Sequence, residues 1–175
     1  MIISYLKFLL SSSNQHGVHS PFIYNFVTKG LYNKIKPKLK HNKTEQLTFK
    51  IANYFSLNSV LIIGCSTKYI ASLISETNSS SEIITNNDFT TLNSKLKDKK
   101  FDFIFLNHLN SILNFETILN SVHNDSVWVI NTPYNTTIWQ QIKTHNAVTV
   151  TVDCFYIGVV FFRKEQAKQH FKIRV

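Results

Sequence analysis

The stretch VLIIGCSTKYIASL, residues 60–73, carries the residue types of a cofactor-binding turn. Four apolar residues run into Gly64, Cys65 and Ser66 follow as a short polar turn, and a helical pattern then begins. Glycine in a strand-to-helix turn lets the backbone approach a cofactor, and the free amides of the helix favour polar or anionic groups. Gly64, Cys65 and Ser66 are therefore candidate cofactor-binding residues.

Polar side chains also end three later apolar runs. Asn86 ends EIITN, Asn107 and His108 follow FDFIFL, and Asn131 and Tyr134 lie in INTPYN. The carboxyl ends of strands in open α/β sheets are where active-site residues collect. His108 is a candidate general base, because its unperturbed pKa of about 6.5 suits proton transfer near neutral pH, and a surface-loop histidine is the alternative. Asn131 and Tyr134 could line a substrate pocket or simply close that space.

The elements that must position these residues alternate from residue 59 onward. The expected strands are 59–64, 81–85, 101–107 and 126–131, and the expected helices are 66–76, 90–97, 111–121 and 136–144. This order predicts right-handed crossovers and a mostly parallel sheet. The runs AVTVTVDCF and YIGVVFFRK lie too close for a crossover, so they predict an antiparallel hairpin with one reversed strand at the sheet edge. The fold class is an open α/β sheet of about six strands.

The length of 175 residues and the hydrophobic fraction of 43% fit one core. We expect a helical N-terminal arm and basic linker over residues 1–43 and the α/β domain over residues 44–175. Three helices are expected before the first strand, at 2–10, 21–32 and 44–55, the last opening at Thr44. The basic tail RKEQAKQHFKIRV is expected to be helical up to His170 and to form a solvated face.

Two histidines precede the second of these helices. His16 and His19 form an H-x-x-H pair, but no third ligand lies near them in the sequence. Ser20 before Pro21 is a good helix start, because serine can cap the first free amides and proline is tolerated there. Turn and capping roles are therefore preferred to metal binding for this segment.

The formal net charge of +9 raises the hypothesis of a nucleic-acid partner, since clustered cations gain affinity for phosphates by releasing counterions. The densest stretch, KGLYNKIKPKLKHNK at 29–43, alternates lysine with apolar residues and contains Pro37. It therefore has no continuous basic helical face. A solvated linker is the preferred interpretation, because the abundance of Lys, Asn and Ile also follows from A- and T-rich codons.

The start of the chain, MIISYLKFLL, is interrupted by Lys7 and lacks the features of a secretory signal. No apolar run approaches the roughly 18–20 residues that span a bilayer, so we expect a cytoplasmic protein without a membrane partner. The two cysteines, Cys65 and Cys154, cannot build a disulfide framework and are expected to be reduced and buried.

A doubly wound sheet that ends in an antiparallel hairpin resembles the class I S-adenosylmethionine-dependent methyltransferases. NQHGVHSPFIYNFVTK and VTVTVDCFYIGVVFFRKEQAKQHFKIRV resemble the two ends of a methyltransferase-like family from Bacteroidetes-type bacteria. The resemblance covers nearly the whole chain and implies a Rossmann-like methyltransferase fold. It also implies S-adenosylmethionine as cofactor, held by Gly64, Cys65, Ser66, Asn86 and Asn107.

The sequence departs from that family where the cofactor would bind. Ile62 stands where the family has an acidic residue, and Lys68 or Tyr69 stands near a later glycine, so a larger side chain would crowd the cofactor. Asn86 stands where an acid would accept hydrogen bonds from ribose hydroxyls, with Asp88 a step later. The short interval before residue 101 also suggests that one crossover has been deleted.

The family's metal-binding stretches correspond to LNHLN and INTPYN, where Asn107, Asn131 and Thr132 occupy the acidic positions. Divalent cations such as Mg²⁺ need charged oxygen ligands, so no metal is expected.

Three functions remain open. The first is methyl transfer from S-adenosylmethionine to an unknown acceptor, with weakened or lost activity. The second is a non-catalytic binding or regulatory protein on the same scaffold, with a small molecule or a protein as partner. The third is a basic nucleic-acid-binding module.

Overall fold

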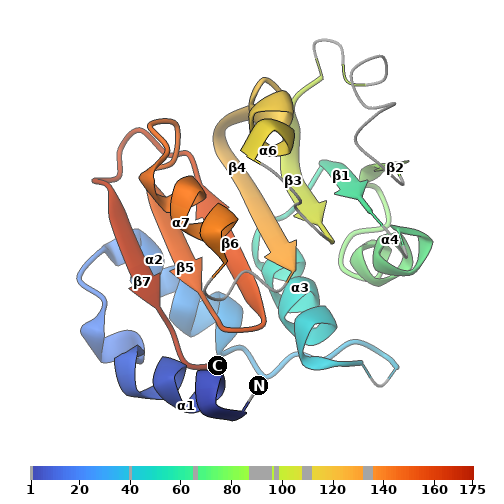
Figure 1. Ribbon diagram of the computed structural model, residues 1–175. Helices are drawn as coiled ribbons and strands as arrows, with labels where there is room; N and C mark the ends of the chain where they lie inside the picture. The colour runs from blue at the N-terminus through green and yellow to red at the C-terminus, as the bar shows by residue number, and fades with distance from the viewer. Residues whose placement is uncertain are drawn as a thin grey trace.

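The structure is a computed structural model that describes residues 2–39, 41–64, 67–86, 96, 99–107, 112–131 and 136–175. These residues form one sheet covered by helices on both faces (Figure 1). None of the helices in these ranges combines the length and the apolar character needed to cross a bilayer.

Seven strands form the sheet in the order β2-β1-β3-β4-β6-β5-β7. They are β1 (Ser59–Ile63), β2 (Glu82–Asn86), β3 (Phe101–Leu106), β4 (Val122–Asn131), β5 (Val150–Asp153), β6 (Ile157–Phe161) and β7 (Gln169–Lys172). All described pairings are parallel except those of β6, which runs antiparallel to both β4 and β5. Strand β2 lies next to one edge of β1, and β3 lies next to the other edge. The direction in which the chain adds strands to the sheet therefore reverses between β1 and β3. Ligands of open α/β sheets bind at such a reversal, outside the carboxyl ends of the strands.

The helices divide between the two faces. The α-helices are α1 (Ile2–Ser11), α2 (Pro21–Asn25), α3 (Lys43–Tyr54), α4 (Thr67–Ser75), α6 (Ile112–Leu119) and α7 (Thr137–Thr144). A short 3₁₀ turn η1 (Gln15–Gly17) precedes α2, and a π-helical segment η2 (Phe26–Leu31) continues it. The side chain of Ser20 accepts a hydrogen bond from the Ile23 amide at the start of α2, as expected.

Alternation along the strands creates two apolar cores. Val60 and Ile62 of β1 face α2, η2, α3 and α4, whereas Leu61 and Ile63 face α6 and α7. Side chains of successive strand residues point to opposite faces, so one apolar strand serves both layers. Helix α2 and the segment η2, both before residue 43, therefore share a core with the sheet.

The predicted hairpin of β5 and β6 is confirmed, but two expectations for this side of the sheet are wrong. The reversed strand β6 lies inside the sheet, between β4 and β5. The tail is not helical up to His170, because Gln169–Lys172 forms β7 and pairs in parallel with β5. Without β7, the backbone amides and carbonyls of β5 would form an open sheet edge. Pairing with these groups favours a strand in the tail, whose helical preference is weak because it has no apolar stripe.

Two element starts also differ from expectation. Helix α3 begins at Lys43, and its cap is Asn42 rather than Thr44. The Asn42 side chain accepts from the Glu45 amide while the Glu45 carboxylate accepts from the Asn42 amide, which is a capping box. Strand β4 begins at Val122 rather than residue 126, and its register with β3 shifts after the first pair. The helix expected at 90–97 falls largely outside the described residues.

The two ends of the chain lie together (Figure 1). The Ser13 amide donates to the Lys172 carbonyl at 2.9 Å, and the Arg174 amide donates to the Ser13 carbonyl at 3.0 Å. Residues 13 and 173 thereby form a parallel bridge beyond the end of β7.

Candidate functional site

A polar cavity opens at the carboxyl ends of β3 and β4, beside the point where the strand order reverses. Its volume is about 180 Å³. Helix α3 contributes its N-terminal end, α4 its first turns, and the two strands their last residues. The lining residues are Asn42, Thr44, Glu45, Tyr69, Ile70, Phe105, Asn107 and Asn131. The cavity therefore lies where an open α/β sheet places a ligand.

Three of the predicted cofactor residues end neighbouring strands. The Gly64 amide donates to the Asn86 carbonyl at 2.9 Å, and the Asn107 amide donates to the Ile63 carbonyl at 2.9 Å. The sheet thus brings Gly64, Asn86 and Asn107 side by side, as expected for consecutive positions along one edge. Asn86 is buried at the end of β2.

The backbone of Gly64 explains why this residue is glycine. Its φ is +113°, a conformation that side-chain-bearing residues rarely adopt. A Cβ added here would lie 2.8 Å from the Cβ of Asn107. Packing against Asn107 therefore requires the glycine whether or not a cofactor binds.

The predicted pocket residue Asn131 is bonded to its neighbours at the cavity. Its Nδ2 donates to Asn107 Oδ1 at 2.8 Å, and Thr44 Oγ1 donates to Asn131 Oδ1 at 3.4 Å. The ends of β3 and β4 are thus joined by one hydrogen bond between two uncharged amides. Amides of this kind can bind a neutral polar group, but they supply no negative charge.

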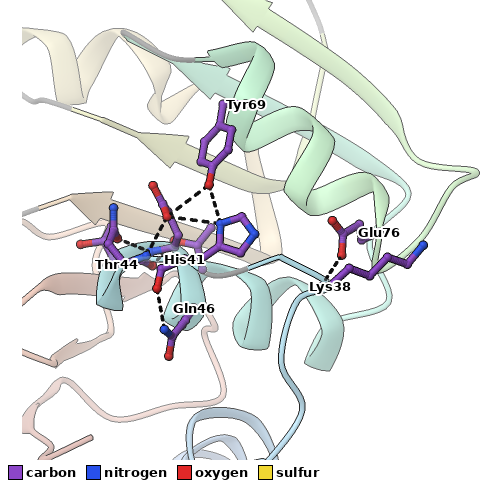
Figure 2. A network of polar contacts seen from close by, with 9 residues as sticks. Lys38, His41, Thr44, Gln46, Tyr69 and Glu76 are labelled. Carbon is purple, nitrogen blue, oxygen red and sulfur yellow. Dashed lines mark hydrogen bonds and ion pairs between the residues drawn. The ribbon is translucent and has the colours of Figure 1, made fainter.

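A second polar cluster joins α3 to α4 beside the cavity (Figure 2). The Tyr69 hydroxyl lies 2.5 Å from His41 Nδ1 and 3.4 Å from Glu45 Oε2. His41 Nδ1 and Glu45 Oε2 are themselves 3.2 Å apart. Burial, and then the adjacent Glu45 carboxylate, raise the pKa of Tyr69, so its phenol keeps its proton near neutral pH. Tyr69 is therefore a hydrogen-bond donor in this cluster.

His41 is buried, and its Nε2 atom has no hydrogen-bond partner among the described residues. Figure 2 shows this nitrogen on the side of the ring away from Tyr69. The spacing of residues 41, 45 and 69 in the sequence gives no sign that they meet. Only the N-x-x-E pattern of Asn42 and Glu45 is a local signal, and it marks a helix start.

The described residues at the cavity fit a bound metal poorly. The strand ends carry Gly64, Asn86, Asn107 and Asn131, none of them acidic, and Glu45 is the one carboxylate among the lining residues. The described part of the chain contains no group of three or more His, Cys, Asp or Glu that could hold a metal ion. Hard divalent cations are held best where several carboxylates offset their charge, and this set offers one carboxylate beside neutral amide oxygens.

The described residues also fit S-adenosylmethionine poorly. Asn86 is buried at the end of β2 and is not among the lining residues of the cavity; by the family resemblance alone, its amide would stand where a carboxylate accepts the ribose hydroxyls. Tyr69 places a large side chain on the first turn of α4, next to the cavity. No catalytic step through this cofactor follows from these residues.

Four of the predicted site residues, Cys65, Ser66, His108 and Tyr134, lie outside the described residues, and their roles stay predictions. The other cysteine, Cys154, is buried, and burial raises the pKa of its thiol, so it remains protonated and unreactive.

The chain resembles known proteins in its fold but not in its sequence. No protein-family model matches the chain, and no curated protein matches it in sequence. A methyltransferase from Geobacter sulfurreducens has a similar structure, with a TM-score of 0.61 and 9% identity over 72% of this chain and 81% of that chain.

Two ligand-bound enzymes are also similar. A Podospora anserina methyltransferase solved with bound SAH has a TM-score of 0.54 and 10% identity, covering 73% of this chain and 81% of its own. The O-methyltransferase TomG from Streptomyces achromogenes, solved in complex with SAM, has a TM-score of 0.55 and 10% identity, covering 71% and 82%. At such identities the likeness concerns the fold alone. The chain thus has the Rossmann-like fold of class I S-adenosylmethionine-dependent methyltransferases, with an antiparallel hairpin in a mostly parallel sheet.

Proposed function

We propose that this protein is a methyltransferase-like protein that has lost metal-dependent methyl transfer and binds S-adenosylmethionine weakly. It would serve as a binding protein on a methyltransferase scaffold. The resemblance of its two ends also supports membership in the methyltransferase-like family of Bacteroidetes-type bacteria.

The observation that carries the proposal is the hydrogen bond between Asn107 and Asn131. These residues occupy the ends of β3 and β4, where the family resemblance expects carboxylates. In the structure they bond to each other at 2.8 Å and carry no charge. A divalent cation here would meet two neutral amide oxygens and, among the lining residues, only the single carboxylate of Glu45.

Support for weak cofactor binding comes from two further positions. Asn86 is an amide where a carboxylate would accept two ribose hydroxyls, and a charged acceptor makes hydrogen bonds roughly twice as strong as a neutral one. Tyr69 adds bulk at the cavity and is held there by its hydrogen bond to His41.

Calorimetric titration of the whole protein with S-adenosylmethionine tests the weak binding. We expect a Kd above roughly 100 μM, equivalent to less than about 5.5 kcal/mol of binding free energy. A stoichiometric Kd below about 10 μM would contradict the proposal, because it would require a pocket that still recognises the cofactor well.

A gain-of-function variant tests the lost metal site. In Asn107→Asp/Asn131→Asp two carboxylates replace the bonded amides, so we expect a lower melting temperature in EDTA and recovery of stability with MgCl₂ or MnCl₂. The wild-type protein should not respond to either salt. Asn25→Asp/Asn146→Asp is the matched control, because it makes the same charge change on α2 and after α7, on elements that cover opposite faces of the sheet. If a metal salt raised the melting temperature of the wild-type protein, the proposed loss of the metal site would be refuted.

A further inference from the structure

Helix α1 exposes an apolar stripe. The four exposed side chains are Ile2 (77% exposed), Ile3 (71%), Leu6 (54%) and Leu10 (89%). At about 100° per residue these positions fall within an arc of about 100° on one side of the helix. Lys7 is exposed at the edge of this arc. We call this surface the α1 stripe.

The opposite side of α1 is fixed to the protein body. Phe8 is buried, and its ring centroid lies 5.5 Å from that of Phe155. The Tyr5 ring meets the same Phe155 edge-on at 4.8 Å. Phe155 adopts a φ of +67°, which is uncommon for a bulky residue and directs the β5–β6 turn toward α1. The helix is therefore apolar on both sides, although only one side is covered.

A shallow apolar groove continues the α1 stripe onto the β5–β6 turn. It has a volume of about 160 Å³ and is lined by Ile2, Tyr5, Leu6, Phe155 and Tyr156. Tyrosine combines an apolar ring with a polar hydroxyl, which suits the boundary between water and hydrocarbon.

The charges around the stripe are positive. Residues 1–44 contain no aspartate or glutamate, and their first lysine is Lys7. Lys172 and Arg174 are exposed at the adjoining chain end, and Lys172 Nζ donates to Ser11 Oγ at 3.2 Å. The nearest carboxylate along the turn, Asp153, is buried and faces Lys143 and Lys172.

We propose that the α1 stripe binds an anionic lipid bilayer surface, with α1 lying flat in the headgroup region. Four large aliphatic side chains supply the apolar contact, and Lys7, Lys172 and Arg174 complement the negative lipid charge. A second copy is a poorer occupant, because a two-fold contact through α1 would bring the same cations together. A helix that lies on a bilayer surface needs no membrane-spanning segment, so the absence of a long apolar run does not argue against this contact.

Sedimentation with vesicles tests this proposal on the full chain. We expect the protein to sediment with phosphatidylcholine vesicles that contain about one quarter phosphatidylglycerol, and to do so at least about tenfold less with pure phosphatidylcholine. Added salt should weaken binding, because it screens the lysines. Lys7→Gln should reduce the partition coefficient about fivefold.

The variant Leu6→Glu/Leu10→Glu should reduce binding at least about tenfold while keeping the wild-type melting temperature, since both side chains are exposed. Leu39→Glu is the control for a carboxylate added outside α1, because Leu39 is also an exposed leucine (71% exposed), and this variant should bind like the wild type. Equal binding by the α1 variant and the wild type, or no sedimentation of the wild type with anionic vesicles, would overturn the proposal. A wild-type dimer in light scattering that the α1 variant dissociates would also overturn it, in favour of a second copy.

Discussion

Replacing Gly64 by alanine tests whether packing alone explains this glycine. Two penalties follow from the structure. The first is a side chain at a φ of +113°, which costs about 1–3 kcal/mol. The second is the 2.8 Å approach to Asn107 Cβ, well inside the optimal separation of about 3.5–4.0 Å, and overpacking of this kind costs about 1–3 kcal/mol. We therefore expect Gly64→Ala to lower the free energy of unfolding by about 3 kcal/mol.

Urea denaturation followed by tryptophan fluorescence is a suitable assay, because Trp128 and Trp139 are both buried in the core. For a domain of this size the expected loss lowers the melting temperature by about 6–12 °C. The measurement needs no ligand, so a loss of stability would show that packing requires glycine at position 64 even when no cofactor is bound.

A double-mutant cycle locates the second penalty. In an Asn107→Gly background the Cβ at position 107 is gone, so Gly64→Ala should cost about 1–2 kcal/mol less than in the wild type. Asn107→Ser is the control, because it removes the amide that bonds Asn131 but keeps the Cβ. A Gly64→Ala variant within about 0.5 kcal/mol of the wild type, or a cost unchanged by Asn107→Gly, would refute the reasoning.

Two further predictions concern stability. Asn42→Ala removes the cap of α3 and should lower the free energy of unfolding by about 1 kcal/mol, whereas Thr44→Ala should cost less, as measured by urea denaturation. Burial acts to raise the pKa of Asp102, but hydrogen bonds from the Ser59 and Asn58 amides and from His123 outweigh it and lower the pKa below its ordinary value. A lowered carboxyl pKa stabilises the fold above the unfolded-state pKa of about 3.9 and stops doing so as the pH falls through the folded-state value. Asp102→Asn should therefore cost about 1 kcal/mol at pH 7, a figure reduced for its partial exposure, and the difference from wild type should shrink below about pH 4. A difference that does not change between these pH values would contradict this assignment.

The meeting of strand ends could be predicted from the sequence. Asn107 and Asn131 each end an apolar run of an expected parallel strand, and parallel neighbours bring their carboxyl ends to one edge. The same argument applies to Gly64 and Asn86, which follow or end two strands of the expected parallel sheet. These positions follow from the period of the strands and the order of the elements, which are local properties of the chain.

The second polar cluster could not be predicted in this way. His41 and Tyr69 belong to different elements, and their contact depends on how α3 packs against α4. The need for glycine at position 64 likewise depends on tertiary structure, because a Cβ there would clash with the Cβ of Asn107. Strand β7 was missed for a related reason, since backbone pairing with β5 decides its conformation rather than its own side chains.

The pairing of Ser13 with residues 172–174 has a consequence for how the protein opens. Backbone hydrogen bonds that fluctuate together exchange their amide protons together. We therefore expect the first and last segments of the chain to open together, so that β7 loses protection from exchange when α1 lifts from the body. Slowed deuterium uptake in β7 would thus signal that α1 is held down.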